Sequence, residues 1–195
     1  MSTMQPRPAH ADDLDAARGW GFAQWARGVA DRRSPFHTPT LATIGRDGAP
    51  RLRTLVLRGF DVATRSLRLH TDARAEKVLE IAAEPRVSLH GYDPGQRVQI
   101  RLEGRATLHT DDALGDAGWA ASRDFSRMCY AIDPGPGMPV GAPLPAPLDP
   151  EAGRPHFAVI RLEFHRMEWL WLAAEGHRRA RFTWGETPTA AWLVP

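Results

Sequence analysis

The longest alternating segment of the chain reads Gln96-Arg-Val-Gln-Ile-Arg-Leu-Glu-Gly-Arg-Ala-Thr-Leu-His109. From Val98 to Leu108 the even positions carry apolar side chains and one glycine, while the odd positions from Arg97 to Thr107 are polar or charged. A period of two places these two sets on opposite faces of a β-strand. The segment therefore predicts an antiparallel sheet that has one face in the core and one polar face.

Turn signals and apolar periodicity divide the rest of the chain into short elements. Strands are predicted at 40–45, 50–60, 66–71, 87–89, 156–172 and 178–184. Helices are predicted at 12–31, at 73–83 with Thr71 or Asp72 as its cap, and at 111–122 with Thr110 or Asp111 as its cap. Because strands dominate and short turns connect them, we expect a closed antiparallel barrel with peripheral helices and not a parallel α/β sheet.

The length and composition predict a single domain over residues 1–195, with an N-terminal helical segment at 1–34 and a Pro/Gly-rich loop at 133–155. Cys129 is the only cysteine, so no disulfide forms within the chain, and we expect this residue to be a buried small hydrophobe. The absence of a secretion signal and of an apolar run of roughly 18 residues predicts a cytoplasmic protein that does not bind membranes.

The basic residues are unusual in kind, because Lys77 is the only lysine among 25 of them. The formal net charge is only +2, and acids are mixed with bases along the chain, which predicts no nucleic-acid partner. The eight histidines show no HExxH spacing, so we expect no metal site. No GxSxG motif or carboxylate pair stands out, so the sequence does not identify a catalytic residue.

Arg74 and Lys77 are three residues apart, so they share one face of the helix predicted at 73–83. Cations are unfavourable in the first turn of a helix, but an anion bound at the free N–H groups would reverse this effect. The spacing therefore allows a phosphate-binding site. It also allows a solvated surface face on which Glu76 and Glu80 offset the two cations.

Arg53 and Arg58 flank the apolar run Thr-Leu-Val-Leu. Each arginine has the alternatives of a ligand contact, a solvated sheet face or an ion pair. Because the two are five residues apart, they should point to opposite faces of a strand unless a bulge intervenes.

Three residues later in the chain carry weaker signals. Gln99 lies on the polar face of the 96–109 strand, where a solvated side chain is the simplest interpretation. Trp171 and Arg181 come from the two arms of the final hairpin, and we expect them to lie nearly opposite each other. The aromatic side chain is a candidate either for the core or for a cofactor site.

Taken together, these segments resemble the pyridoxamine 5′-phosphate oxidase-related FMN-binding split barrels. The resemblance is carried by the hairpin Leu41–Pro50, the segment Arg53–Arg58, the pair His70-Thr71, the turn Arg74-Ala75-x-Lys77, the strand start Gln99–Gly104, and the ten-residue spacing of Trp171 and Arg181. Each motif is weak alone, but their order and spacing match the family from the first helix to the end of the chain.

The resemblance implies a mainly β (α+β) fold, an antiparallel Greek-key split β-barrel with peripheral helices. It also implies FMN as cofactor at the interface of a homodimer. Arg53, Arg58, Arg74 and Lys77 would hold the phosphate and ribityl chain, and Gln99, Trp171 and Arg181 would reach the flavin, some of them from a second subunit. The full set of implied cofactor-binding residues is Arg53, Thr54, Leu55, Val56, Leu57, Arg58, His70, Thr71, Arg74, Ala75, Lys77, Gln99, Trp171 and Arg181.

The family implies an FMN-dependent oxidoreductase with a small-molecule substrate. Its oxidases carry a substrate-binding Arg-x-His before the final arginine, whereas this chain has His177-Arg178-Arg179, so His177 and Arg179 become the candidate substrate-binding residues. Three alternatives stay open: a non-catalytic FMN-binding or storage protein, a true pyridoxamine 5′-phosphate oxidase with an altered substrate-phosphate site, and a site for haem or a deazaflavin.

Overall fold

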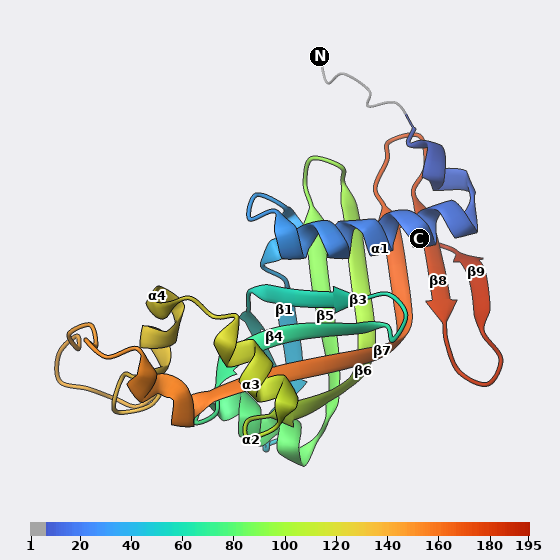
Figure 1. Ribbon diagram of the computed structural model, residues 1–195. Helices are drawn as coiled ribbons and strands as arrows, with labels where there is room; N and C mark the ends of the chain where they lie inside the picture. The colour runs from blue at the N-terminus through green and yellow to red at the C-terminus, as the bar shows by residue number, and fades with distance from the viewer. Residues whose placement is uncertain (1–6) are drawn as a thin grey trace.

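The computed structural model describes residues 7–195, and within that range the strands form one antiparallel sheet (Figure 1). The strands are β1 (Thr40–Ile44), β2 (Pro50–Thr54), β3 (Leu57–Asp61), β4 (Ser66–Asp72), β5 (Arg86–Asp93), β6 (Val98–His109), β7 (Phe157–Trp171), β8 (Arg178–Thr183) and β9 (Thr189–Leu193). The strand order is β2-β1-β5-β6-β7-β4-β3, and β8 and β9 extend the sheet from the C-terminal half of β7.

The short connection between β2 and β3 requires the sheet to curl. β2 and β3 lie at opposite ends of the strand order, yet only Leu55 and Val56 separate them along the chain. The two ends must therefore approach each other. Among the described residues β2 and β3 do not pair, so the barrel is split. The antiparallel split barrel is confirmed, and the expectation of a closed barrel is wrong.

The single return strand predicted at 50–60 is also wrong, because this segment forms two strands with different partners. β2 pairs with β1, whereas β3 pairs with β4. The chain leaves β2 at Leu55, whose amide donates a hydrogen bond to the Pro39 carbonyl at 3.0 Å. Periodicity did not predict the change of partner, because it reports which face is buried and not which strand lies alongside.

β6 and β7 form the longest ladder of the sheet. β6 alternates buried and more exposed side chains over most of its length, as predicted. A register shift after Glu103 leaves His165 of β7 without an opposite residue. A Cβ atom at Gly104 would lie 2.1 Å from the Glu163 carbonyl oxygen, so only glycine fits this close approach. On its other edge β7 pairs with β4 before this bulge and with β8 after it.

Helix α1 (Leu14–Ala30) confirms the helix predicted at 12–31 and lies across one face of the sheet (Figure 1). The Asp13 carboxylate accepts from the Ala16 amide at 2.7 Å and caps the helix start. Trp25 packs edge-on against Phe36 of the 3-10 helix η2 (Pro35–His37), and both rings are fully buried. A 3-10 turn, η1 (Ala9–Asp12), precedes α1, and residues 1–6 of the predicted 1–34 segment lie outside the described range.

Three shorter helices are α2 (Glu76–Ala83), α3 (Ala113–Ala120) and α4 (Asp124–Arg127). α3 packs on β7 at Gly118, where a Cβ atom would lie only 2.7 Å from Val159 Cγ2. Glycine at this position therefore allows the helix to approach the sheet. None of the helices within residues 7–195 has the length and apolar character needed to cross a bilayer.

Neither predicted helix cap is observed. Asp112 caps α3, because its carboxylate accepts from the amides of Leu114 and Gly115 at 3.1 and 2.9 Å. α2 has no side-chain cap. The Asp72 carboxylate accepts instead from the Arg74 amide at 2.8 Å, in the turn before the helix. Asp and Thr favour both caps and turns, so the sequence does not separate these roles.

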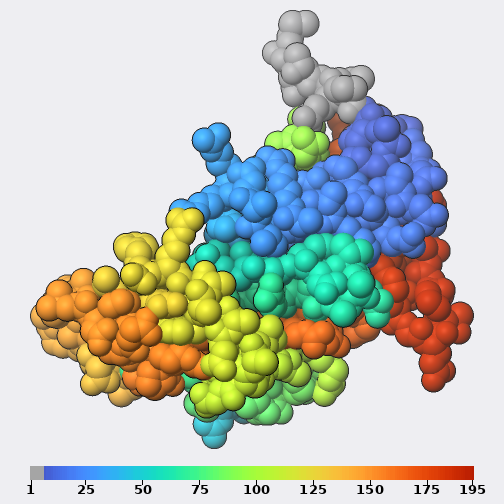
Figure 2. Space-filling view, in the orientation of Figure 1, coloured from blue at the N-terminus to red at the C-terminus, as the bar shows by residue number. Residues whose placement is uncertain are grey.

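The Pro/Gly-rich segment contains no helix or strand from residue 134 to 150, and the 3-10 helix η4 (Glu151–His156) follows it. This part projects from one side of the barrel (Figures 1 and 2). Cys129 lies nearby in the 3-10 turn η3 (Met128–Tyr130) and is exposed, so the expectation of a buried thiol is wrong. A peripheral turn has no second layer to cover every side chain.

Two glycines of α1 provide a matched test of this packing. Gly19→Ala should stabilise the protein by about 0.5–1 kcal/mol, because nothing lies within 4 Å of the added Cβ and alanine favours the helix. Gly28→Ala should destabilise it by about 1–3 kcal/mol, because the Cβ would lie 2.6 Å from the Phe36 carbonyl oxygen. Urea unfolding of both variants measures the two changes. Equal changes of the same sign would contradict the proposed contact between α1 and η2.

Candidate functional site

A cluster of polar side chains joins β1, β2, β4 and α2. We call Thr43, Arg53, Thr71, Lys77 and Glu80 the Arg53–Lys77 cluster. The Glu80 side chain is 0% exposed, and its Oε2 atom accepts from Arg53 Nη2 at 2.7 Å and from the Thr43 hydroxyl. Arg53 Nη1 also donates to the Thr43 hydroxyl oxygen. Lys77 Nζ donates to the Thr71 hydroxyl at 3.2 Å.

The charges of this cluster are not balanced around Lys77. Burial lowers the pKa of Lys77, and the nearby charge of Arg53 lowers it further. Asp72 and Glu80 act in the opposite direction but do not restore the ordinary value. A pKa lowered in this way means that the ammonium lacks water and negative charge. A bound anion would supply that charge, so the cluster is suited to holding one.

Arg74 lies just before α2 and not in its first turn, so the predicted helical pairing with Lys77 is wrong. The guanidinium is held by the Asp72 carboxylate at 3.0 and 2.7 Å, and this hydrogen bonding raises the pKa of Arg74. Arg74 Nη2 also donates to the carbonyl oxygens of Tyr130 and Ile132. The side chain therefore anchors the start of the long loop. Whether it also contacts a phosphate stays a prediction.

A second basic site is a cavity of about 330 Å³ between the end of α1, η2, β3, β4 and the α3–α4 region. Within residues 7–195 no carboxylate lines it, and its basic lining residues are Arg32, His37, Arg58, Arg68, His70 and Arg123. We call it the arginine pocket. Figure 2 shows α1, the β3–β4 hairpin and the α3–α4 segment meeting on this face of the molecule.

Two imidazoles of the arginine pocket have defined environments. Burial lowers the pKa of His70 to about 4, with the charges of Arg58 and Arg68 adding to the shift, so this ring is neutral at pH 7. His37 Nδ1 lies 2.7 Å from the Gly28 carbonyl oxygen, which can only accept. Nδ1 therefore carries the proton, and Nε2 of the neutral ring is an acceptor.

Arg53 and Arg58 belong to different sites, which answers the question left by their five-residue spacing. The β3–β4 ladder has a register shift between Leu57 and Gly59, so Arg58 sits at a bulge. Arg58 and Leu57 line the arginine pocket, whereas Arg53 is in the Arg53–Lys77 cluster. The segment Thr54–Val56 connects the two sites along the chain. Ala75, also predicted to contact the cofactor, is buried immediately before α2.

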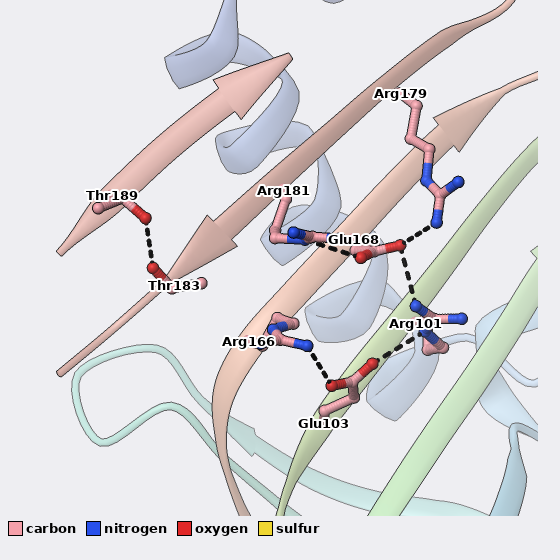
Figure 3. Close-up of polar contacts among 8 residues, drawn as sticks. All are labelled: Arg101, Glu103, Arg166, Glu168, Arg179, Arg181, Thr183 and Thr189. Carbon is pink, nitrogen blue, oxygen red and sulfur yellow. Dashed lines mark hydrogen bonds and ion pairs between the residues drawn. The ribbon is translucent and has the colours of Figure 1, made fainter. Parts of the chain in front are cut away.

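A third polar group lies on the outer face of the sheet, formed by β6, β7 and β8 (Figure 3). The Glu168 side chain is only 6% exposed and accepts from Arg179 at 2.6 Å, Arg181 at 2.9 Å and Arg101 at 3.0 Å. Burial raises the pKa of Glu168, but hydrogen bonds from Arg179 and Arg181 outweigh this effect and lower it. Three guanidinium groups around one carboxylate leave this face with excess positive charge.

Trp171 and Arg181 do not lie opposite each other, which corrects the prediction. In the β7–β8 ladder Trp171 pairs with Arg178, and Arg181 pairs with Glu168. Trp171 is 3% exposed and belongs to the hydrophobic core, on the opposite face from Arg181. Of the two roles expected for this aromatic side chain, core or cofactor site, the single chain shows the core.

The other late residues border this outer face. Gln99 pairs with Leu170, two register positions from the Arg101–Glu168 pair and on the same face of the sheet. His177 is exposed in the β7–β8 turn, where its Nδ1 accepts from the Ala173 amide at 3.0 Å. Of the two candidate substrate residues, only Arg179 therefore contacts Glu168.

The outer-face group is remote from the Arg53–Lys77 cluster within one chain. Thr71 pairs with Ala158 of β7, and Gln99 pairs with Leu170. These β7 positions are twelve residues apart (170 minus 158). At about 3.3 Å per residue, this is roughly 40 Å along the strand. The structure therefore divides the predicted cofactor residues into groups that one chain does not bring together.

Sequence reasoning missed several residues of the arginine pocket. Arg32, His37, Arg68 and Arg123 come from four separate parts of the chain with no shared spacing, two of them in loops. Thr43 and Glu80 were missed as partners of Arg53 for the same reason. An isolated Thr in a strand or Glu in a helix carries no signal until the fold places it beside an arginine.

Residues 22–110 match the sequence profile of the pyridoxamine 5′-phosphate oxidase FMN-binding domain. The chain is 30% identical over 141 residues to pyridoxine/pyridoxamine 5′-phosphate oxidase 2 of Arabidopsis thaliana, covering 67% of this chain and 71% of that protein. The chain belongs to the pyridoxamine 5′-phosphate oxidase-related FMN-binding family.

Solved structures agree with this assignment. A pyridoxamine 5′-phosphate oxidase-related FMN-binding protein from Nostoc punctiforme has 30% sequence identity and a TM-score of 0.76, covering 91% of this chain and 96% of that one. PhzG from Burkholderia lata has a TM-score of 0.74 at 21% identity, covering 99% of this chain and 100% of that one. At this identity the PhzG structure supports the fold alone.

The environment of His70 leads to a titration prediction. The His70 ring should titrate in NMR with a midpoint of about pH 4. Arg58→Ala should raise that midpoint, because removing a neighbouring positive charge favours the protonated ring. The rise should be partial, since burial is the main cause of the shift. A wild-type midpoint near the ordinary histidine value of about 6.5 would show that the arginine pocket is open to water.

Proposed function

We propose that this chain binds FMN and is an FMN-dependent oxidoreductase whose substrate is a small anionic molecule. The observation that carries the cofactor proposal is the Arg53–Lys77 cluster, where Arg53 pairs with the buried Glu80 carboxylate and the nearby Lys77 is part-buried with a lowered pKa. The cluster lies within the residues that match the FMN-binding profile. Its donors fit a phosphate, because guanidinium, ammonium and hydroxyl groups all donate to anionic oxygens.

In this proposal the phosphate is held by Arg53, Lys77 and Thr71. The flavin ring then lies along the backbone of residues 54–57, which lead from the cluster to the arginine pocket. Bound FMN would supply hydride and electron transfer, and the protein would supply orientation and electrostatics. The chain's own residues are therefore assigned to binding and proton positions.

The arginine pocket is the proposed substrate site. Its lining of four arginines and two histidines without a carboxylate favours a phosphate or carboxylate group on the substrate. Arg58 and Leu57 line the pocket and also end the segment assigned to the flavin, so a molecule in the pocket would lie beside the ring. His37 lines the pocket, and in this proposal its Nε2 accepts a proton from the substrate.

The arginine pocket also helps to choose between an enzyme and a non-catalytic FMN store, and it suggests where a true pyridoxamine 5′-phosphate oxidase would bind its substrate. A non-catalytic FMN store needs the phosphate cluster but no second anion pocket, so the arginine pocket favours an enzyme. A true pyridoxamine 5′-phosphate oxidase would place its substrate phosphate among these arginines in place of the rearranged His177 and Arg179. Formation of pyridoxal 5′-phosphate from pyridoxamine 5′-phosphate under air would support that narrower activity, and its absence would remove it.

We further propose a homodimer in which two chains complete each site. Gln99 and Arg181 lie roughly 30–40 Å along β7 from Thr71 of the phosphate cluster, so in this proposal a second subunit brings them to the flavin. Arg181 would then place a positive charge near the N1–C2=O edge of the ring. Such a charge stabilises the reduced anionic flavin, and Arg181→Ala should lower the midpoint potential.

Removing the cluster's ammonium group tests the cofactor site. Purified protein mixed with FMN should bind it, and Lys77→Ala should weaken binding by about 1.5–3 kcal/mol because a charge-assisted contact is lost. Titration of FMN fluorescence measures both affinities. Arg86→Ala is the control, because it removes an exposed cation that pairs with Glu84 outside the cluster. Failure of the wild type to bind FMN, or equal affinities in Lys77→Ala and wild type, would refute the phosphate assignment.

Subunit complementation tests the shared site. Lys77→Ala and Arg181→Ala chains carrying different tags should each bind FMN weakly as homodimers. If Lys77 of one chain and Arg181 of the other serve the same flavin, the purified heterodimer has one site with both changes and one intact site. Its intact site should recover wild-type affinity. Two equally damaged sites in the heterodimer would instead place both residues of a site on one chain.

A further inference from the structure

We infer that Glu80 is a positioning residue of the flavin site, which holds the Arg53 guanidinium in the orientation that binds the FMN phosphate. The inference rests on the proposed function, because it assigns a role toward the same phosphate. It adds a residue that the sequence motifs did not include. The supporting observations are the burial of Glu80, its contacts and one unpaired oxygen atom.

Because Glu80 is buried, its carboxylate depends on its protein contacts for stabilisation. Its side chain is 0% exposed on α2, the helix that packs against β1 and β6. A carboxylate removed from water is unfavourable unless charged or hydrogen-bonding partners compensate it. The partners observed are Arg53 and Thr43, which both bond to the same Oε2 atom. Glu80 therefore contacts the β1 and β2 residues of the Arg53–Lys77 cluster.

These contacts fix the Arg53 guanidinium and still leave N–H donors for a ligand. Glu80 and Thr43 take Nη2 and Nη1, and the side chain is still 21% exposed. A guanidinium has five N–H donors, so an arginine fixed on one edge keeps donors for an anion on another. Fixing the side chain before the ligand arrives reduces the entropy lost on binding.

Glu80 also influences the second cation of the cluster, Lys77, and has one carboxylate oxygen to spare. Glu80 Oε1 is buried and has no hydrogen-bond partner among the described residues. Lys77 lies three residues earlier on α2, and the charge of Glu80 raises the pKa of Lys77 against the lowering effect of Arg53. Glu80 thus acts on both cations of the cluster. A carboxylate this close to a phosphate also repels it, so a positioning role and a repulsive role make opposite predictions.

Two variants of Glu80 separate length from charge. Glu80→Asp keeps the charge but shortens the side chain, so it should lose the contact with Arg53 and weaken FMN binding by about tenfold. Glu80→Gln keeps the length and one acceptor oxygen, and it should lose less. Riboflavin, which lacks the phosphate, should bind both variants within about twofold of wild type, because the change acts through Arg53 on the phosphate alone.

Matched controls and a double-mutant cycle complete the experiment. Glu76→Asp makes the same change at an exposed position of α2 and should leave both affinities unchanged. In an Arg53→Ala background, Glu80→Asp should cause no further loss of FMN affinity. If the Glu80 variants do not fold, Thr43→Val removes the hydroxyl shared by Glu80 and Arg53, and it should reduce FMN binding selectively.

The outcomes distinguish this inference from the proposed function. Wild-type protein that binds no FMN refutes the proposed function, and the inference with it. Wild-type protein that binds FMN, with Glu80→Asp unchanged or Glu80→Gln tighter than wild type, refutes only the positioning role. Equal losses of FMN and riboflavin would assign Glu80 to structural support of the barrel and would also overturn it.

Discussion

The fold depends on one strand, β7, which pairs with β6 along its length and changes its other partner from β4 to β8 at the His165 bulge. Before the bulge β7 belongs to the curled part of the sheet, and after it β7 belongs to the extension that ends in β9. Ladder hydrogen bonds need a partner on each side, so this change of neighbour determines which side chains meet. It places the Arg53–Lys77 cluster and the Glu168 group near opposite ends of the same strand.

Buried glutamates organise the basic residues at both ends. Glu80 bonds to Arg53 and Thr43 inside the barrel, and Glu168 bonds to three arginines on the outer sheet face (Figure 3). Glu168 faces three arginines, and Glu80 pairs with Arg53 while Lys77 lies nearby, so in both groups the cations outnumber these buried carboxylates. This arrangement suits anionic ligands, because desolvated cations gain more from an anion than solvated ones. The arginine pocket lacks even one such carboxylate among its lining residues.

Much of the local structure could be predicted from the sequence. The 96–109 strand, the helix at 12–31 and the final hairpin have strong periodicity, and the structure confirms them. Most of the predictions that failed depend on contacts between distant segments. The partner change within 50–60, the capture of Arg74 by Asp72 and the loop, and the opposite faces of Trp171 and Arg181 are examples. β9 was missed because most of its residues are exposed and its apolar pattern is weak.

The amino-acid sequence by itself determined which residues face the core, where the chain turns and which family motifs it carries, because those properties depend on short-range spacing and side-chain chemistry. Only the tertiary structure decided that Arg53 and Arg58 serve different sites and that Glu80 joins the first of them. It also decided that six basic side chains from strands, a 3-10 helix and loops line one cavity. Strand pairing and register set these relations, and neither is encoded in the spacing of neighbouring residues.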